Sequence, residues 1–226
     1  MSDKSDDMDD PQLNIYEEQM GYLRIEKSLR NYGNFALRLV EDKRKHYASV
    51  AAHHRAILPN YEAHFARMAE CVRANNALLQ DICEYSSQCM FFGYWPRGSV
   101  IEGEIDKPTA LDTDKVLSTL RQFVRDWSEE GKPERDACYG PLLRQLESCF
   151  PNVSVRKHVK VLVPGSGLSR LAYEIFSRGF SAQGSEFSHH MLICGSYVLN
   201  HIPKANMYTI YPFVHNVTNN RIREDP

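Results

Sequence analysis

The 226-residue sequence lacks the features that mark membrane, nucleic-acid-binding and secreted proteins. No apolar run approaches the length of a membrane span, and the acidic residues 1–10 form neither a signal peptide nor a mitochondrial presequence. The formal net charge is only −2 and no basic face emerges along the chain, so we expect no nucleic-acid partner. The remaining composition is that of a soluble globular protein of one or two domains.

A disulfide framework and a metal centre also lack support. The six cysteines contain no Cys-x-x-Cys pair, which is typical of reduced thiols in a cytosolic or nuclear protein. Four histidines gather at His46, His53, His54 and His64 without two-His-plus-carboxylate spacing, and neighbouring positions of a helix face different directions. We therefore predict no metal site.

Residues 159–171 contain an apolar run, a glycine-rich turn and the first residues of a helical pattern. The turn, at residues 164–169, is the glycine corner. The run is typical of a buried parallel strand, and Gly165 and Gly167 follow it, where the absence of a Cβ lets the backbone approach a ligand. The apolar positions beyond the corner recur every three or four residues, the spacing of one buried helix face, at Leu168, Leu171, Ala172, Ile175 and Phe176. The stretch predicts a strand, a tight turn and a helix.

A second strand, predicted over residues 180–185, ends at Glu186, about twenty residues beyond the first glycine. Nucleoside-binding folds carry their ribose acid at this place, because a carboxylate accepts hydrogen bonds from both ribose hydroxyls. Gly-x-Gly turns and exposed glutamates are each common on their own. The prediction of a nucleoside site therefore depends on the order of strand, glycine corner, helix, strand and acid.

The kind of nucleoside follows from what the corner lacks. A pyrophosphate-binding loop has the pattern Gly-x-Gly-x-x-Gly, but the third glycine is replaced by Arg170, which disfavours a dinucleotide. No Gly-Lys-Ser/Thr is present to hold a triphosphate. A nucleoside without phosphates remains, and S-adenosylmethionine is the commonest ligand of that kind.

Several strings around the corner resemble the carnosine N-methyltransferase family: VLVPGSGLSRLA at 161–172, QGSEFS at 183–188 and ML at 191–192. The proline inside the corner and the Gln-Gly-x-Glu-aromatic-Ser pattern are more specific than the glycines. The string RDWS at 125–128, together with residues 131–141, is similar to the helical lid of that family. The resemblance runs from about residue 16 to the end of the chain.

The chain ahead of the corner predicts a helical region behind a disordered acidic tail at 1–14. Amphipathic helices are expected from 16 to about 56 and from 61 to about 92, joined as a hairpin. A loop rich in glycine and proline is expected at 93–108.

Two further helices are predicted between this loop and the corner. The first has Asp112 or Thr113 as its N-cap and runs to Glu130. The second begins at Pro133 and ends before Pro151, and its inward residues are predicted to be Tyr139, Leu142, Leu143 and Leu146.

Gln122 and Arg125 lie three positions apart on the first of these helices and therefore share a face. Taken alone, Arg125 beside Asp126 and Glu129 is typical of a surface ion pair. In the family that the chain resembles, these two positions hold the methionine end of the cofactor, where a guanidinium binds a carboxylate through two hydrogen bonds. The residues that the resemblance implies for S-adenosylmethionine binding are Gln122, Arg125, Gly165, Gly167 and Glu186.

The resemblance implies an α/β fold, with a helical N-terminal domain at 15–150 and the first part of a Rossmann-like class I methyltransferase domain at 151–226. The sheet is expected to be incomplete, because only two βα units precede Pro226 and such a sheet has about seven strands. The implied reaction moves a methyl group from S-adenosylmethionine to an imidazole nitrogen of carnosine and gives anserine. The acceptor-site Asp, His and Tyr of the family are expected beyond Pro226, so no catalytic residue is assigned and the chain alone is expected to be inactive.

A second hypothesis remains open, in which the chain is a short non-catalytic isoform or relative whose helical domain binds a protein partner. The sequence does not distinguish carnosine from another histidine dipeptide or from a histidine in a protein as the acceptor. The long helices could support a homodimer, and no membrane partner is expected.

Overall fold

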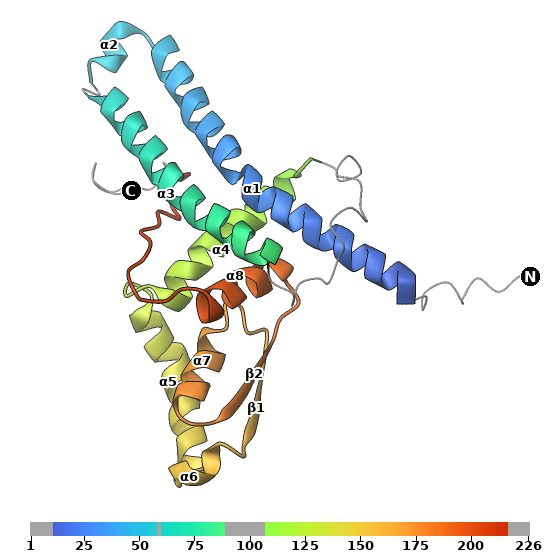
Figure 1. The fold of residues 1–226 in the computed structure, drawn as a ribbon. Helices are drawn as coiled ribbons and strands as arrows, with labels where there is room; N and C mark the ends of the chain where they lie inside the picture. The colour runs from blue at the N-terminus through green and yellow to red at the C-terminus, as the bar shows by residue number, and fades with distance from the viewer. Residues whose placement is uncertain (1–10, 58–59, 89–106, 217–226) are drawn as a thin grey trace, which may run out of the picture.

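The computed structural model describes residues 11–57, 60–88 and 107–216, with side chains described from residue 20 onward (Figure 1). It is mostly helical and contains a two-stranded parallel sheet, in agreement with the α/β class. The acidic residues 1–10 and residues 93–106 of the loop predicted at 93–108 lie outside the described residues. In the part of the chain that is described, no helix combines the length and the apolar character needed to cross a membrane.

A long helical hairpin forms the upper part of the molecule in Figure 1. Helix α1 (Pro11–Ser49) packs along helix α3 (Tyr61–Gln88), and the short helix α2 (Ala52–Arg55) lies at the tip. Proline suits the first turn of a helix, where its missing N–H has no partner to lose. Helix α1 therefore includes residues 11–14, which the sequence placed in the disordered tail.

Helix α4 (Ala110–Trp127) packs across the hairpin, and its N-cap is Thr109. The Thr109 side chain accepts a hydrogen bond from the Asp112 N–H at 3.3 Å, and the Asp112 carboxylate accepts one from the Thr109 N–H at 2.8 Å. This reciprocal capping box satisfies two backbone donors that the helix itself leaves unpaired. The prediction of Asp112 or Thr113 as the N-cap is wrong, because Asp112 is the third helical residue of the box.

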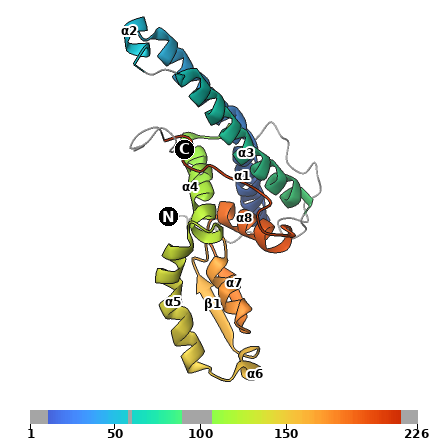
Figure 2. The same cartoon turned by 90° about the vertical axis from the view of Figure 1, so that its left-hand side faces the viewer.

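The α/β part follows helix α4 and lies below the hairpin in Figure 2. Its elements in chain order are α5 (Lys132–Cys149), α6 (Val153–Arg156), β1 (Lys160–Pro164), α7 (Arg170–Ser177), β2 (Ser181–Ser185) and α8 (His189–Asn200). The two strands are parallel, with Lys160 opposite Ser181 and Pro164 opposite Ser185. The predicted order of strand, turn, helix and strand is therefore confirmed.

Two apolar clusters stabilise the molecule. The larger joins the hairpin to α4 and α8 and contains Leu29, Leu79, Leu120 and Ile193, which are fully buried. The smaller joins one face of the sheet to α5 and α7, and its buried members are Leu143, Val163, Ala172, Ile175 and Phe180. Helix α8, which follows residue 150, thus packs in the helical core, and helix α5, which precedes it, packs against the sheet. The two clusters therefore do not divide the chain at residue 150, where the domain boundary was expected.

The opposite face of the sheet is open. Leu162 is 59% exposed, although the apolar run predicted a strand buried on both faces. Successive side chains of a strand point to opposite faces, and the packed helices cover only the face of Val161 and Val163. Leu142 and Phe176 were predicted to face inward and are also exposed, because each lies one position off the buried stripe of its helix.

Candidate functional site

The carboxyl ends of the two parallel strands meet at the glycine corner. Pro164 and Ser185 are paired as the last residues of their strands, and the Ser166 N–H donates to the Ser185 carbonyl at 3.0 Å. Ser169 N–H then donates to the Ser166 carbonyl at 2.8 Å, which closes the turn into helix α7. In open α/β sheets, ligands bind at this edge of the sheet, outside the carboxyl ends of the strands.

Three residues of the corner adopt left-handed backbone conformations. Gly165 has φ of 64° and Gly167 has φ of 55°, which glycine reaches without steric cost. A Cβ added at Gly165 would contact nothing within 4 Å, so open space lies beside this backbone. Ser169 has φ of 65° although it carries a Cβ, and this conformation costs an ordinary residue about 1–2 kcal/mol.

Glu186 lies directly beside the corner. One carboxylate oxygen accepts a hydrogen bond from the Gly167 N–H at 2.8 Å, and the other accepts from the N–H groups of Phe187 and Ser188, also at 2.8 Å. The side chain is half-buried, and a carboxylate has about four lone-pair sites, so acceptor capacity remains for a ligand. The structure therefore brings Gly167 and Glu186 into direct contact across 19 positions of sequence.

Gln122 also reaches the corner, from helix α4. A Cβ added at Gly167 would lie 3.4 Å from the Gln122 Nε2 atom and 3.4 Å from the Asp126 Oδ2 atom. Gln122 itself donates a hydrogen bond from Nε2 to Asp126 Oδ2 at 3.0 Å. The amide is therefore held against the glycine backbone by the next turn of its own helix.

Arg125 is placed differently. Its Nε atom forms an ion pair with Glu134 of helix α5 at 3.0 Å, and both side chains are about half exposed to solvent. The partner is thus neither Asp126 nor Glu129, the neighbours considered from the sequence. The pair uses one edge of the guanidinium, which has five N–H donors in total.

Two residues at the end of α4 hold the corner and were not identified from the sequence. The Asp126 Oδ2 atom accepts a hydrogen bond from the Leu168 N–H at 3.3 Å, and the Trp127 Nε1–H donates to the Leu168 carbonyl at 3.1 Å. The Arg170 guanidinium lies 5.0 Å from the Trp127 ring centroid. The available signal was the four-residue spacing from Gln122 to Asp126, which places both side chains on one helix face.

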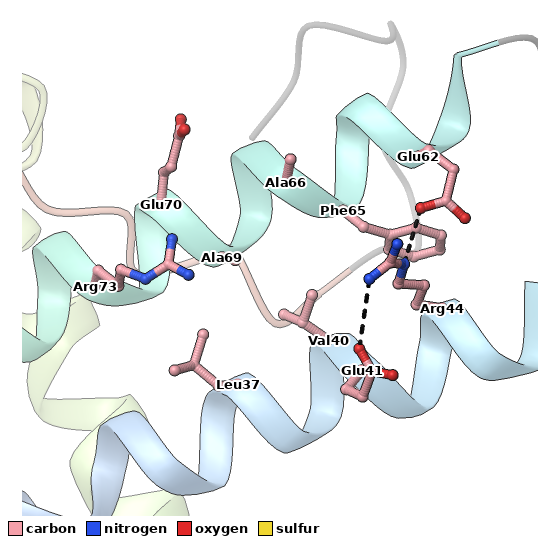
Figure 3. Close-up of a pocket in the computed structure, with 10 residues that line it drawn as sticks. All are labelled: Leu37, Val40, Glu41, Arg44, Glu62, Phe65, Ala66, Ala69, Glu70 and Arg73. Carbon is pink, nitrogen blue, oxygen red and sulfur yellow. Dashed lines mark hydrogen bonds and ion pairs between the residues drawn. The ribbon is translucent and has the colours of Figure 1, made fainter.

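Two hollows of the molecular surface lie away from Gly165, Gly167 and Glu186. A cavity of about 670 Å³ lies between α5 and α7 and includes Trp127 and Arg170 in its wall. A groove of about 510 Å³ separates α1 from α3, with Leu37, Val40 and Phe65 on its floor (Figure 3). The charged residues around this groove are Glu41, Arg44, Glu62, Glu70 and Arg73, and the dashed lines in Figure 3 join Arg44 to both Glu41 and Glu62.

Among the described residues, no group of three or more His, Cys, Asp and Glu side chains could hold a metal ion.

Comparison with known proteins points to one family. A family model described as carnosine N-methyltransferase matches residues 102–226. The carnosine N-methyltransferase of Mus musculus is 35% identical over 210 residues, which cover 92% of this chain and 52% of that protein. The carnosine N-methyltransferase of Schizosaccharomyces pombe is 34% identical over 200 residues, covering 86% and 52%, and that of Dictyostelium discoideum is 36% identical over 210 residues, covering 88% and 45%. The chain spans about half the length of these curated relatives.

Proposed function

This chain belongs to the carnosine N-methyltransferase family, and on that premise we propose that it provides the S-adenosylmethionine-binding half of a methyl-transfer site. The acceptor is an imidazole nitrogen of carnosine or a related histidine dipeptide, and carnosine gives anserine. The observation that carries this proposal is the contact of Glu186 with the Gly167 N–H at 2.8 Å, at the carboxyl ends of two parallel strands.

The proposed fold places residues 151–226 in the first part of a Rossmann-like class I methyltransferase domain and residues 15–150 in a helical domain. The parallel pairing of β1 and β2 through helix α7 supports this assignment, because a βαβ unit is the building block of such a sheet. The open face of Leu162 agrees with a sheet that receives further elements in a complete domain.

The residues present fit the proposed cofactor. Glu186 supplies a half-buried carboxylate for the ribose hydroxyls, and Gly165 leaves open space beside the backbone for the nucleoside. At the amino-acid end, the Gln122 Oε1 atom has no hydrogen-bond partner among the described residues. Arg125 retains guanidinium donors for a carboxylate beyond its contact with Glu134.

S-adenosylmethionine supplies a sulfonium methyl group that an amine-like nitrogen can accept without a covalent enzyme intermediate. The contribution of this chain is to bind and orient that donor, since a fixed approach converts a bimolecular step into an effectively unimolecular one. An imidazole accepts the methyl group only through an unprotonated nitrogen, which requires a neutral ring. We assign no residue of this chain to the handling of that proton.

Substitution of Glu186 tests the proposed cofactor site. We expect Glu186→Gln to weaken S-adenosylmethionine binding about ten- to hundredfold, because the amide offers one acceptor oxygen and no charge to the ribose hydroxyls. Isothermal titration calorimetry of the 226-residue chain measures the affinity. The matched control is Glu129→Gln, which removes an exposed carboxylate in the turn after helix α4 and should leave the affinity unchanged. Equal affinities for the wild type and Glu186→Gln would contradict the site.

A further inference from the structure

Asp126 is a buried carboxylate at the glycine corner, with only 1% of its surface exposed. Its Oδ2 atom accepts hydrogen bonds from Gln122 Nε2 at 3.0 Å and from the Leu168 N–H at 3.3 Å. Its Oδ1 atom accepts one from the Tyr139 hydroxyl at 3.3 Å. Burial, followed by the Asp126 charge, raises the pKa of Tyr139, so this hydroxyl remains a donor to the carboxylate.

The charge of Asp126 has no cationic partner in the part of the chain that the structure describes. Two arginines close to Asp126 form ion pairs with other residues: Arg125 pairs with Glu134, and Arg170 pairs with Glu174. Arg170 does reach Asp126, but it donates to the backbone carbonyl at 3.3 Å and not to the carboxylate. Charged side chains are almost never fully buried without an opposite charge, because the loss of hydration is expensive.

Asp126 also fixes the orientation of Gln122. An ionised carboxylate only accepts hydrogen bonds, so the Gln122 amide must turn its NH2 group toward it. This leaves the Gln122 carbonyl oxygen, an acceptor, for a ligand. Both side chains lie 3.4 Å from the position of a Cβ on Gly167, so they pack directly against the corner at this glycine.

We propose that Asp126 makes this end of the corner selective for a cation. Its charge complements a positively charged ligand group, and it holds Gln122 so that an acceptor oxygen faces the same group. The inference rests on the proposed function, and it identifies the complemented groups as the sulfonium and ammonium of S-adenosylmethionine. Because Asp126 is buried against the corner, it acts through its charge and through Gln122 and not by direct contact.

The test compares a charged and a neutral nucleoside. Asp126→Asn keeps the size of the side chain and an oxygen that can accept from Leu168, but it removes the charge. We expect this variant to bind S-adenosylmethionine about tenfold more weakly, because opposite charges attract strongly inside a protein. It should bind 5′-methylthioadenosine, which has neither the sulfonium nor the ammonium group, within twofold of the wild type. The matched control is Asp136→Asn, whose carboxylate is 63% exposed on helix α5.

Calorimetry with both nucleosides, together with thermal melting and circular dichroism of each variant, distinguishes the outcomes. Equal losses of affinity for the two nucleosides would assign Asp126 a structural role only and overturn the inference, and so would no loss for either. A wild-type chain that binds neither nucleoside would remove the proposed function and this inference with it. Binding by the wild type with a selective loss in Asp126→Asn supports both.

A second variant keeps the inference testable if Asp126→Asn does not fold. Gln122→Met removes the oriented amide from a half-buried position and leaves Asp126 in place. We expect Gln122→Met to reduce the preference for S-adenosylmethionine over 5′-methylthioadenosine severalfold. An unchanged preference would overturn the proposed orientation of Gln122.

Discussion

His190 is a neutral histidine enclosed in the helical core. It is 3% exposed at the start of helix α8, and its Nε2 atom lies 3.3 Å from the Ser28 Oγ atom of α1. Burial, and next the charge of Lys115, lowers the pKa of His190 to about 4. In the unfolded chain the imidazole titrates near its ordinary pKa of about 6.5, so protonation favours unfolding over the interval between these two values.

We therefore expect acid to destabilise the fold through His190. The stabilisation is fully present above pH 6.5 and is lost as the pH falls toward 4, with a cost of about 2 kcal/mol between pH 7 and pH 4.5. His190→Phe, which keeps an aromatic ring but has no nitrogen to protonate, should flatten this dependence. Urea denaturation across the interval measures it. Burial also lowers the pKa of His215 to about 4, so part of the pH dependence should persist in His190→Phe. An unaltered pH dependence in this variant would contradict the assignment to His190.

At the scale of elements, Asn75 joins helix α3 to the segment that follows α8. This asparagine is fully buried, and it accepts a hydrogen bond from the Tyr211 N–H at 2.7 Å and donates to the Tyr211 carbonyl at 2.9 Å. It also donates to the Tyr32 hydroxyl of α1 at 2.9 Å. One side chain thus satisfies both backbone groups of a residue that lies outside regular structure.

Removal of this side chain should loosen the segment. We expect Asn75→Ala to cost about 3 kcal/mol of unfolding free energy, because it leaves buried donors and acceptors unpaired. Asn200→Ala, at an exposed position of α8 whose side chain donates to Ser196 one turn away, should change the unfolding free energy by no more than about 0.5 kcal/mol. Chemical denaturation followed by circular dichroism compares the two. A cost below about 1 kcal/mol for Asn75→Ala would show that apolar contacts hold the segment.

Element types were predictable from the sequence, whereas several ends and faces were not. The periodicity identified α3, α5 and α7, and the strand, turn, helix and strand around Gly165 follow from local pattern alone. The start of α4 was missed because Thr109 precedes the apolar stripe, and only the reciprocal bond with Asp112 identifies it. The exposure of Leu162 depends on which helices pack on the sheet, and the sequence of the strand alone does not determine this.

Of the candidate site, the sequence predicted the members that a local motif or a spacing defines. The two predicted strands end next to Gly165, Gly167 and Glu186. Parallel pairing brings the ends of these strands together, which explains why Glu186 contacts Gly167. The Gln122 contact with the corner required the docking of a helix about forty residues upstream, and only the family resemblance indicated it. Asp126 was not predicted, because a carboxylate beside an arginine is typical of a solvent-exposed position.

At the scale of the whole molecule, helices pack on one face of the two-stranded sheet, and no helix of the described residues covers the other face. Leu162 projects from this open face, and among the described residues β1 and β2 pair only with each other, so each has an outer edge. Exposed apolar strands of this kind promote association between copies of a chain.

Substitution of Leu162 should therefore reduce self-association. We expect Leu162→Lys to lower the fraction of oligomers at high protein concentration while the melting temperature stays within a few degrees, because the side chain contributes little to the core. Sedimentation velocity measures the species present. The comparison is Phe176→Lys, an exposed apolar position on helix α7 away from the open face. An equal effect of both variants would show that the open face has no special role.

The backbone of Leu168 connects the glycine corner to helix α4. Both of its backbone polar groups are paired with side chains of α4, through bonds that span 41 and 42 positions of sequence. Contacts of this separation close a long loop, and the entropy of that closure must be paid before the contact stabilises the chain. The glycine turn consists of residues that are close in sequence, but two of its hydrogen bonds can form only after helix α4 docks on it. We therefore expect the proposed nucleoside site to form late in folding, when helix α4 docks on the glycine turn.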